Sequence, residues 1–495
     1  MLEARAMKSQ IAEFFANQTV FLTGGGGFLG KVLIEKLLRE CSDVSKIYML
    51  MRQKKGKTPQ QRVSEVFDFP CFDYIKANNA AIIKKVHVIH GDCQKPDLGL
   101  DPEDVRVLKA ETTCVIHAAA SVRFDQSLKE ASYNVRATRD ILELAKQMAN
   151  LKCFIFVSTA YSNPLNAHVK EDFYEPPIEA EKLLNVVNSL DDSVLQRVTP
   201  QLLGEWPNTY VYTKSISESL IRSIDTFPIA IIRPGIILSS AKEPMPGWID
   251  NFYGPVGIAT GAGVGVLKTF HAKRDAVAAM VPVDYVVNAL LSIMWRIGTE
   301  KTKTPTVYNF AGHKTNKITW GQFTDNLREL YWIAIPKCLF WYVSFVLREN
   351  QISYKLTTFF SHTLFGYIID FVLFCLGKRT LAVKGYARLH KTLDLIAWFS
   401  TRTWDFDDNN ILKLWSEMGE EDKKIFDFNM EKLNWDAYLR DSAFGMRYFL
   451  LKESLETVPE AKRKLRIMFV AHYAIIILFW FLMYKLMTFM YGLFV

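Results

Sequence analysis

Short apolar segments alternate with amphipathic ones along roughly the first 300 residues. The short segments are rich in branched and aromatic side chains, which is typical of strands buried on both faces of a sheet. Lys31–Glu40 instead repeats apolar residues at helical spacing. The expected strands are Thr19–Leu22, Lys46–Met51, Val86–His90, Thr113–His117, Phe154–Val157, Ile229–Ile232 and Thr306–Phe310. Strands alternating with helices predict an α/β fold with a doubly wound parallel sheet.

The pattern changes after the last of these strands. Leu330–Leu347 and Leu356–Leu376 are apolar stretches near the length that spans a bilayer, but polar residues interrupt both. They are either helices that contact or re-enter a membrane or helices buried in a soluble domain. Trp404–Lys452 returns to a charged, amphipathic pattern. We expect a mainly helical C-terminal domain there.

The C-terminal residues carry the clearest membrane signal. Ile467–Tyr484 contains His472 but no Lys, Arg, Asp or Glu, and the apolar run continues to Val495. This length crosses a hydrocarbon core of about 30 Å. The four basic residues directly before it are Lys462, Arg463, Lys464 and Arg466. By the positive-inside rule they stay in the cytosol, so we expect a tail anchor, with an interfacial helix as the alternative.

Charge and cysteine content narrow the range of partners. Lys and Arg total 60 against 52 Asp and Glu, a net charge of +8 that suits nucleic acid, anionic lipid or a phosphate-bearing ligand. No nucleic-acid-binding signature accompanies this charge, so we expect no such partner. The seven cysteines are scattered without metal-binding spacing, which argues against a zinc site and for a reducing compartment. Residues 1–18 lack a signal-peptide core, so the main body is expected to face the cytosol.

A glycine-rich turn joins the first strand to the first helix. Gly24, Gly27 and Gly30 allow a tight turn, close approach of a pyrophosphate and close packing of the helix on the sheet. The helix N-terminus then offers free N–H groups and a positive dipole end to phosphates. We expect a Rossmann-type dinucleotide site here. Its candidate contacts are Thr23, Gly24, Gly26, Gly27, Phe28, Leu29 and Gly30.

The end of the second strand bears on which nicotinamide cofactor binds. An NAD site usually has Asp or Glu there, whereas this chain has Arg52 and Lys54, with Arg62 adding charge. These cations favour the 2′-phosphate of NADPH over NADH. Asp92, followed by Cys93, comes after the third strand and is placed to contact the adenine amino group. A helix cap or turn is the alternative role for an isolated Asp.

A tyrosine and a lysine four residues apart form the candidate catalytic pair. Tyr210 and Lys214 share one face of a helix, and the ammonium is expected to lower the pKa of the phenol toward working pH. Ser158 and Thr159 follow the fifth strand, at the edge of the sheet where ligands of such folds bind. Together these hydroxyls predict a proton donor to a carbonyl oxygen.

These motifs resemble the extended short-chain dehydrogenase/reductases. The broad resemblance rests on Thr23–Gly30, Gly91–Asp92, His117–Ser121, Asn134–Val135, Val157–Tyr161 and Tyr210–Lys214. More closely, and over nearly the whole chain, the sequence is similar to the eukaryotic alcohol-forming fatty acyl-CoA reductases. The closer match rests on Gly27–Lys31, Met51–Lys54, Ser121–Phe124, Asn208–Lys214, Val281–Tyr285, Trp404–Asp407, Leu414–Trp415 and Tyr448–Glu453.

The resemblance implies a reaction and roles for the residues. NADPH would deliver hydride to the thioester carbon of a long-chain acyl-CoA, and Tyr210 would protonate the oxygen. Thr159, with Ser158 as the alternative, would hydrogen-bond the same oxygen, while Lys214 would hold the cofactor ribose and polarise Tyr210. Coenzyme A would leave an aldehyde, which a second NADPH would convert to a primary alcohol.

The remaining cofactor contacts follow from the same resemblance. Ala119 lies in a matched motif after the fourth strand, and Asn134 would order the site through water or backbone contacts. His117 is expected to be a core residue.

The resemblance also implies a domain order and a location. We expect a reductase domain at 1–325, membrane-contacting helices at 326–385, a helical male-sterility-type domain at 386–456 and a transmembrane anchor at 467–489. The expected partners are long-chain acyl-CoA and membrane lipid. The expected location is the endoplasmic reticulum membrane, with the peroxisomal membrane as the alternative.

Two other functions fit part of the sequence. A membrane-bound steroid-type dehydrogenase or a sugar-nucleotide epimerase would share the N-terminal motifs, but the C-terminal motifs argue against both. A non-catalytic, membrane-tethered lipid-binding protein would not need Thr159, Tyr210 and Lys214 intact.

Overall fold

The computed structural model describes residues 9–54 and 56–494; residues 1–8, 55 and 495 lie outside the described part. The chain forms two compact units built from interleaved segments. The first contains residues up to Trp248, then Val277–Ile318 and Arg402–Tyr438. The second contains Ile249–Ala276, Thr319–Thr401 and the residues from Leu439 onward. The sequence predicts domains of consecutive residues, whereas each of these units combines segments that are distant in sequence.

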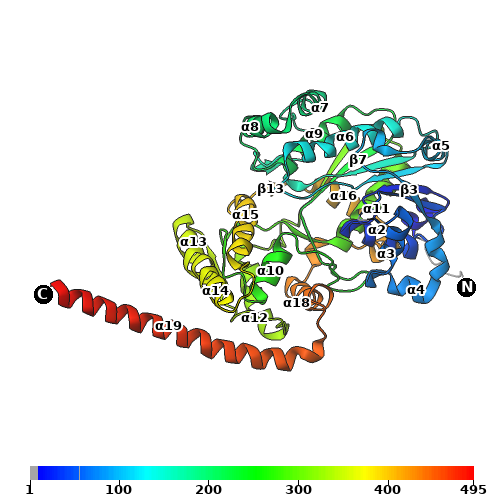
Figure 1. The fold of residues 1–495 in the computed structure, drawn as a ribbon. Helices are drawn as coiled ribbons and strands as arrows, with labels where there is room; N and C mark the ends of the chain where they lie inside the picture. Colours follow the sequence, from blue (N-terminus) through cyan, green and yellow to red (C-terminus); the bar gives the residue numbers. More distant parts are fainter. Residues whose placement is uncertain (1–8, 55, 495) are drawn as a thin grey trace, which may run out of the picture. The chain divides into compact units, whose positions relative to one another are not determined.

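A seven-stranded sheet is the centre of the first unit, and every neighbouring pair of its strands is parallel (Figure 1). All seven strands expected from the sequence are present, and the doubly wound α/β fold is confirmed. In spatial order they are β11 (Thr306–Phe310), β7 (Ile229–Pro234), β5 (Cys153–Val157), β4 (Cys114–His117), β1 (Thr19–Thr23), β2 (Lys46–Met51) and β3 (Val86–His90).

Helices cover both faces of this sheet. In Figure 1, α6 (Leu128–Ala145) and α9 (Thr209–Arg222) lie on one face, and α2 (Phe28–Glu40) and α11 (Val283–Glu300) lie on the other. Apolar side chains of the strands and of α6 and α9 form a continuous core with less than a tenth of their surface exposed. Helix α2 begins three residues before the expected start, because Gly27 already serves as its N-cap.

The other helices of the first unit are mostly short. Capping boxes start α3 at Thr58 and α6 at Ser127, each with an acid or amide three residues later. The remaining helices are α1 (Gln10–Phe15), α3 (Pro59–Phe67), α4 (Asp73–Asn79), α5 (Pro102–Glu111), α7 (Ala180–Ser189), α8 (Asp192–Leu203), α16 (Asn409–Glu417), α17 (Glu420–Ile425) and the start of α18 (Trp435–Gly445). Two parallel pairs of short strands add to the unit: β8 (Ile236–Leu238) with β10 (Met280–Pro282), and β6 (His168–Val169) with β13 (Asp405–Phe406).

The second unit is mainly helical. Its one pair of strands among the described residues is β9 (Thr269–His271) with β12 (Val346–Arg348). The helices are α10 (Pro255–Gly263), α12 (Trp320–Ile333), α13 (Gln351–Thr358), α14 (Leu364–Cys375), α15 (Ala382–Ser400) and α19 (Val458–Phe494). A π-helical turn, Phe359–Thr363, joins α13 to α14 without a break.

One expected helix is absent. Helix α12 ends at Ile333, the chain from Ala334 to Phe345 has no regular helix, and β12 follows. The expectation of a helix over Leu330–Leu347 is therefore wrong. Pro336 explains the break, because a proline disfavours helical conformation in the residue before it and lacks the N–H that a helix needs.

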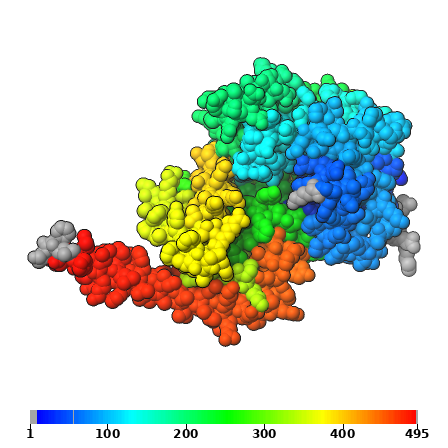
Figure 2. Space-filling model, viewed as in Figure 1, coloured from blue at the N-terminus to red at the C-terminus, as the bar shows by residue number. Residues whose placement is uncertain are grey.

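Two helices of the second unit are long and apolar enough to cross a membrane. They are the continuous run Gln351–Cys375 and the C-terminal helix over Leu455–Gly492. Their large apolar side chains are exposed, for example Phe371 at 67%, Phe374 at 72% and Trp480 at 63%. Figure 2 shows the two segments, in yellow and in red, at the surface. Exposure on this scale is unusual for a helix that is dissolved in water.

Candidate active site

The glycine turn adopts a conformation that side chains would block. Gly24 has a φ of +80°, and a Cβ there would lie 2.8 Å from the backbone of Ala118 and Ala119. A Cβ on Gly30 would overlap the Gly24 carbonyl oxygen. The Gly27 N–H donates to that same oxygen at 2.9 Å, which closes the turn. Bare backbone and a helix N-terminus therefore meet at the carboxyl end of β1, as dinucleotide phosphates require.

The other candidate residues of the turn extend it into the first turns of α2. Gly26 is half-buried and Gly27 is exposed, so the backbone of both residues faces the surface. Phe28 stacks on Trp248 with ring centroids 5.2 Å apart, and Leu29 is half-buried. The Lys31 ammonium donates to the Gly26 carbonyl at 3.1 Å, which holds the turn from the helix side.

Thr23 and His117 tie β1 to β4 just beneath this turn. Thr23 Oγ1 lies 2.8 Å from His117 Nδ1 and accepts a hydrogen bond from the Ala119 N–H at 3.2 Å. His117 is buried, and desolvation lowers its pKa to about 3. Asn134 accepts from the Ser121 N–H at 3.2 Å and donates to Thr213 Oγ1 at 3.3 Å. Asn134 thus links the β4 loop to the helix that carries Tyr210.

A basic cluster lies at the ends of β2 and β3. Arg52 Nη1 is 2.9 Å from Gln94 Oε1 and 3.5 Å from Asp92 Oδ2, with over a third of its side chain exposed. Arg62 donates to the Arg52 carbonyl at 2.7 Å, and Lys54 is exposed. Burial and the charge of Arg52 both lower the pKa of Arg62. Nearby carboxylates neutralise the positive charge of this cluster only in part, so the cluster can bind an anionic ligand.

Asp92 and Cys93 differ in their environment. Asp92 accepts from the Gln94 N–H at 3.0 Å, which is the turn role that an isolated Asp often takes. Burial raises the pKa of the Cys93 thiol to about 12. Cys93 is therefore an apolar wall and not a nucleophile.

Tyr210 and Thr159 meet at the carboxyl end of β5. Asn208 caps α9 by accepting from the Val211 N–H at 3.0 Å, which places Tyr210 in the first turn. Thr159 is buried and is a hydrogen-bonding partner of the Tyr210 phenol. Phe124 stacks on the other side, with ring centroids 5.8 Å apart. The phenol and the Thr159 hydroxyl can therefore address one ligand oxygen.

The expected lowering of the Tyr210 pKa is wrong. Burial raises the pKa of the phenol, and the hydrogen bond from Thr159 opposes this only in part. Lys214 Nζ instead donates to the Val157 carbonyl at 2.6 Å and lies 4.4 Å from the centre of the Phe156 ring. Tyr210 is therefore protonated near neutral pH, and its raised pKa makes it a weaker acid than a free phenol.

Lys214 is a buried amine whose charge depends on pH. Burial lowers its pKa to about 7, and the carboxylate of Glu218, one helical turn away, raises it. A lysine with this pKa changes its charge near neutral pH.

Ser158 has a different role from its neighbour Thr159. Ser158 Oγ donates to Glu218 Oε1 at 2.5 Å. Arg233 donates to both oxygens of Glu218, at 2.9 Å and 2.7 Å, and all three residues are buried. The Ser158 hydroxyl is thus committed to a buried ion pair, which leaves Thr159 as the hydroxyl beside Tyr210.

Sequence reasoning missed this ion pair. Glu218 lies four residues after Lys214, on the same buried face of α9, and Arg233 lies in the apolar strand β7. Charged residues at positions that the hydrophobic pattern buries were the available signal, since buried charges are usually paired.

The candidate residues line up along one edge of the sheet. Thr159, Ala119, Gly24, Arg52 and Asp92 follow β5, β4, β1, β2 and β3, which are adjacent in that order. The structure therefore places these five residues at one edge of the sheet, with Thr159 at one end and Arg52 and Asp92 at the other.

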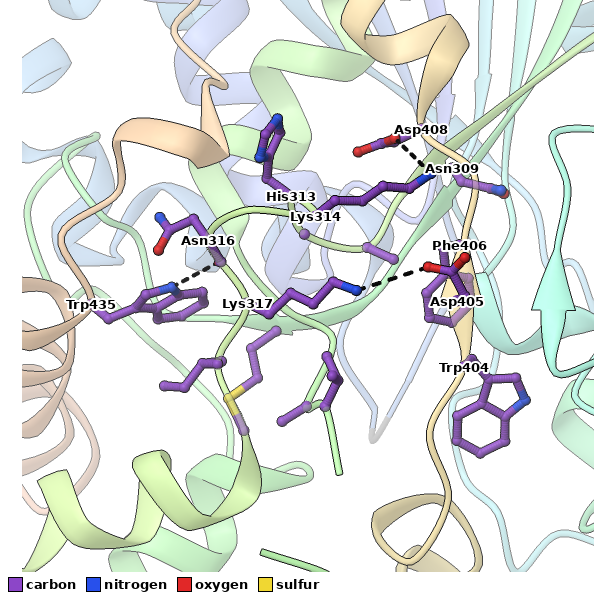
Figure 3. A pocket seen from close by; sticks show the side chains of 16 residues that line it. Asn309, His313, Lys314, Asn316, Lys317, Trp404, Asp405, Phe406, Asp408 and Trp435 are labelled. Atoms are coloured by element: carbon purple, nitrogen blue, oxygen red, sulfur yellow. Dashed lines mark hydrogen bonds and ion pairs between the residues drawn. The ribbon is translucent and has the colours of Figure 1, made fainter. Parts of the chain in front are cut away.

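A pocket lies farther along the same edge, after β11. The loop 311–318 forms one wall, and Trp404, Phe406 and Trp435 contribute aromatic side chains (Figure 3). Tyr161, two residues after Thr159, packs edge-on against Trp404 and Phe406, with ring centroids 5.3 Å and 5.9 Å apart. The aromatic wall of the pocket therefore rests on the loop that carries Thr159.

Comparison with known proteins agrees with this geometry. Two family models described as male sterility protein match the chain, an NAD-binding one at residues 22–290 and a second at residues 361–453. The chain is 36% identical to "Fatty acyl-CoA reductase wat" of Drosophila melanogaster, covering 96% of this chain and 92% of that protein. It is also 36% identical to "Fatty acyl-CoA reductase 1" of Homo sapiens, covering 92% and 89%. The chain belongs to the fatty acyl-CoA reductase family.

Solved structures share the fold of this family member. The terminal R domain from the myxalamid PKS-NRPS biosynthetic pathway aligns with a TM-score of 0.58 at 20% identity, covering 87% of this chain and 90% of that domain. The reductase domain of a non-ribosomal peptide synthetase from Mycobacterium tuberculosis aligns with a TM-score of 0.57 at 18% identity, covering 90% and 96%. The NAD-binding family model, which matches the region that contains the parallel sheet and the glycine turn, supports a nicotinamide cofactor site.

Proposed function

We propose that this protein reduces long-chain fatty acyl-CoA to a primary fatty alcohol, with NADPH as the reductant. The observation that carries the proposal is the meeting of Tyr210 and Thr159 at the edge of the sheet that also presents the glycine turn. Relatives that are named fatty acyl-CoA reductases along nearly the whole chain support it.

Each residue of the site has a different role in the proposed reaction. When bound, NADPH would supply the hydride for both reductions, that of the thioester carbon and that of the aldehyde that remains after coenzyme A leaves. Tyr210 donates its proton to the carbonyl oxygen as charge develops there. Thr159 donates a hydrogen bond to the same oxygen, and Lys214 orients the ribose side of the cofactor. The raised pKa of Tyr210 keeps the proton on the phenol until that oxygen becomes basic.

The basic cluster supports NADPH over NADH. Arg52 ends β2 where an NAD site usually places a carboxylate, and its guanidinium is only loosely paired with Asp92. A 2′-phosphate there would gain a bidentate, charge-assisted contact. Lys54 and Arg62 would add attraction, Asp92 would contact the adenine amino group from the turn that it stabilises, and the backbone at Gly24, Gly26, Gly27 and Gly30 would hold the pyrophosphate.

The exposed apolar helices support attachment to a membrane. We assign residues 467–489 within α19 as a spanning tail anchor, with the basic residues from Lys462 to Arg466 on the cytosolic side. The run Gln351–Cys375 is a second membrane contact. We propose that the reductase unit faces the cytosol, at the endoplasmic reticulum membrane or, alternatively, at the peroxisomal membrane.

Purified full-length protein in detergent tests the reaction directly. We expect NADPH oxidation that depends on hexadecanoyl-CoA, with hexadecanol identified by mass spectrometry and two NADPH consumed per alcohol. Steroid ketones and sugar nucleotides, the substrates of the rival functions, are expected to give no turnover. NADPH oxidation with a steroid ketone, or epimerisation of a sugar nucleotide, without reduction of acyl-CoA would reject the proposal.

Membrane fractionation tests the attachment. Full-length protein is expected to resist carbonate extraction, and an epitope placed after the last residue is expected to be protected from protease in intact microsomes. A chain ending before Ile467 is expected to stay partly bound through Gln351–Cys375. If that shorter chain is fully soluble, the second contact is absent.

A further inference from the structure

The pocket after β11 lies on the opposite side of the catalytic hydroxyls from the nucleotide features. In the sheet, β7 and β11 lie on one side of β5, and β4, β1, β2 and β3 lie on the other. The glycine turn and Arg52 belong to the second group, whereas loop 311–318 follows β11. A ligand in this pocket would therefore approach Thr159 from the side away from the cofactor.

The walls of the pocket are held in place by hydrogen bonds. Trp404 Nε1 donates to the Pro164 carbonyl at 3.0 Å, and Trp435 Nε1 donates to the Asn316 carbonyl at 3.1 Å. Asn316 Nδ2 in turn donates to the carbonyls of Met430 and Leu433 at 2.7 Å and 2.8 Å. Such a preformed site loses little conformational freedom when a ligand binds.

Two lysines extend along this pocket, and each forms a long ion pair with an aspartate (Figure 3). Lys314 Nζ is 3.9 Å from carboxylate oxygens of Asp407 and Asp408, and Lys317 Nζ is 3.9 Å from Asp405. These separations are those of ion pairs and are too long for hydrogen bonds, and Asp405 and Asp408 line the pocket beside the lysines. An anionic ligand would therefore exchange these ion pairs for contacts of its own with the two ammonium groups. Both lysine side chains are more than 40% exposed.

We propose that this pocket binds the coenzyme A part of the acyl-CoA substrate, with Lys314 and Lys317 contacting its phosphates. The proposal rests on the function proposed above. Aromatic and apolar walls suit the pantetheine arm, and ammonium groups suit the phosphates. An acyl chain is a poor match, because charged side chains would lose hydration against it.

Two thioesters with the same acyl group separate carrier recognition from chemistry. Hexadecanoyl-CoA carries the phosphates, whereas the hexadecanoyl thioester of N-acetylcysteamine lacks them. In the double variant Lys314→Ala/Lys317→Ala, we expect the KM for hexadecanoyl-CoA to rise roughly tenfold. The KM for the short thioester and the KM for NADPH are expected to stay within about twofold of the wild type.

Matched variants control for charge and for folding. Lys303 is exposed and precedes β11, at the other end of the same strand, so Lys303→Ala should leave both thioesters unaffected. Lys314→Arg/Lys317→Arg should retain most of the affinity for hexadecanoyl-CoA. Free coenzyme A should inhibit the wild type competitively, with an inhibition constant that rises in the alanine variant as much as the KM does.

The outcomes distinguish this proposal from the function on which it rests. Equal KM changes for both thioesters, or no change for hexadecanoyl-CoA, would overturn the assignment of the pocket. A wild-type protein that reduces neither thioester would instead overturn the proposed function. A selective loss of hexadecanoyl-CoA affinity, with the Lys303→Ala control unchanged, supports both.

Discussion

The two ends of the candidate active site are built in opposite ways. At the hydroxyl end, Thr159, Lys214 and the Glu218–Arg233 pair are buried. Lys214 donates a hydrogen bond to the Val157 carbonyl, and Arg233 donates to Glu218. At the basic end, Arg52 is more than a third exposed and its nearest carboxylate oxygen is 3.5 Å away. The first end is preorganised before any ligand arrives, and the second gains its contacts only with the ligand.

This difference predicts how each end contributes. Buried, fixed dipoles act strongly on a developing charge, because little reorganisation is needed and water does not screen them. Exposed cations attract a phosphate through a screened interaction that salt weakens. Substitutions at the hydroxyl end should therefore lower kcat, and substitutions at the basic end should raise the KM of the cofactor.

Removal of the Tyr210 hydroxyl should have the largest effect. Tyr210→Phe deletes the proton donor while the ring keeps its stacking on Phe124, so kcat should fall by ~10²–10⁴-fold with NADPH binding nearly intact. Tyr212→Phe is the matched control, since Tyr212 packs against Trp206 in the core. Steady-state kinetics and NADPH fluorescence titration measure the two quantities. Near-normal alcohol production by Tyr210→Phe would make Tyr210 a structural residue.

The second-largest effect should be a difference in kcat between variants of the two neighbouring hydroxyls. Thr159→Val removes a hydrogen bond to the reacting oxygen and should lower kcat by ~10²-fold. Ser158→Ala removes only a bond to Glu218, so its kcat should change by no more than several-fold. Comparable losses in both variants, measured at saturating substrates, would mean that the end of β5 acts as a unit and that Thr159 has no separate role.

Charge reversal at the basic end should change cofactor preference. Arg52→Glu should raise the KM for NADPH roughly tenfold, because a charge-assisted phosphate contact is lost, and should change the KM for NADH much less. Lys57→Glu, an exposed reversal in the same loop, is the control. The wild-type KM for NADPH should also rise with ionic strength, more steeply than in the Arg52 variant. Equal effects of Arg52→Glu on both cofactors would exclude a 2′-phosphate contact.

The sheet and the glycine turn were predictable from sequence because each has a local signature. All seven strands are short runs of branched apolar residues, and spacing alone places Gly24 and Gly30 between β1 and α2. The pairing of Tyr210 with Lys214 on one helix was likewise a matter of local periodicity. These features depend on residues that are close in sequence.

Features that depend on distant residues were not predictable in this way. Ser158 and Arg233 both donate hydrogen bonds to Glu218, and the three residues belong to three different elements. No periodicity in the sequence predicts this network. The segment Arg402–Tyr438 groups with the reductase unit although its helical pattern resembles that of the sequence around it. Hydropathy also predicted too long a helix at Leu330–Leu347, where Pro336 prevents the helix that the apolar composition favours.

The smallest expected effect is a shift of the pH profile, and it tests how the buried ion pair acts on Lys214. Burial lowers the Lys214 pKa to about 7, and the negative charge of Glu218 raises it. If protonated Lys214 supports turnover, kcat falls as the pH rises through this pKa. His117, which interacts electrostatically with Lys214, is neutral in this range, because burial lowers its pKa to about 3.

Glu218→Gln keeps the shape of the side chain and removes its charge. The Lys214 pKa should then fall further, so the alkaline limb of the kcat profile should move to lower pH. Ser158→Ala, which keeps the Glu218 charge, should leave that limb in place. A Glu218→Gln variant with lower activity but an unmoved limb would show that Glu218 only supports packing. A shifted limb would show that the preorganised end of the site also sets the charge of its lysine.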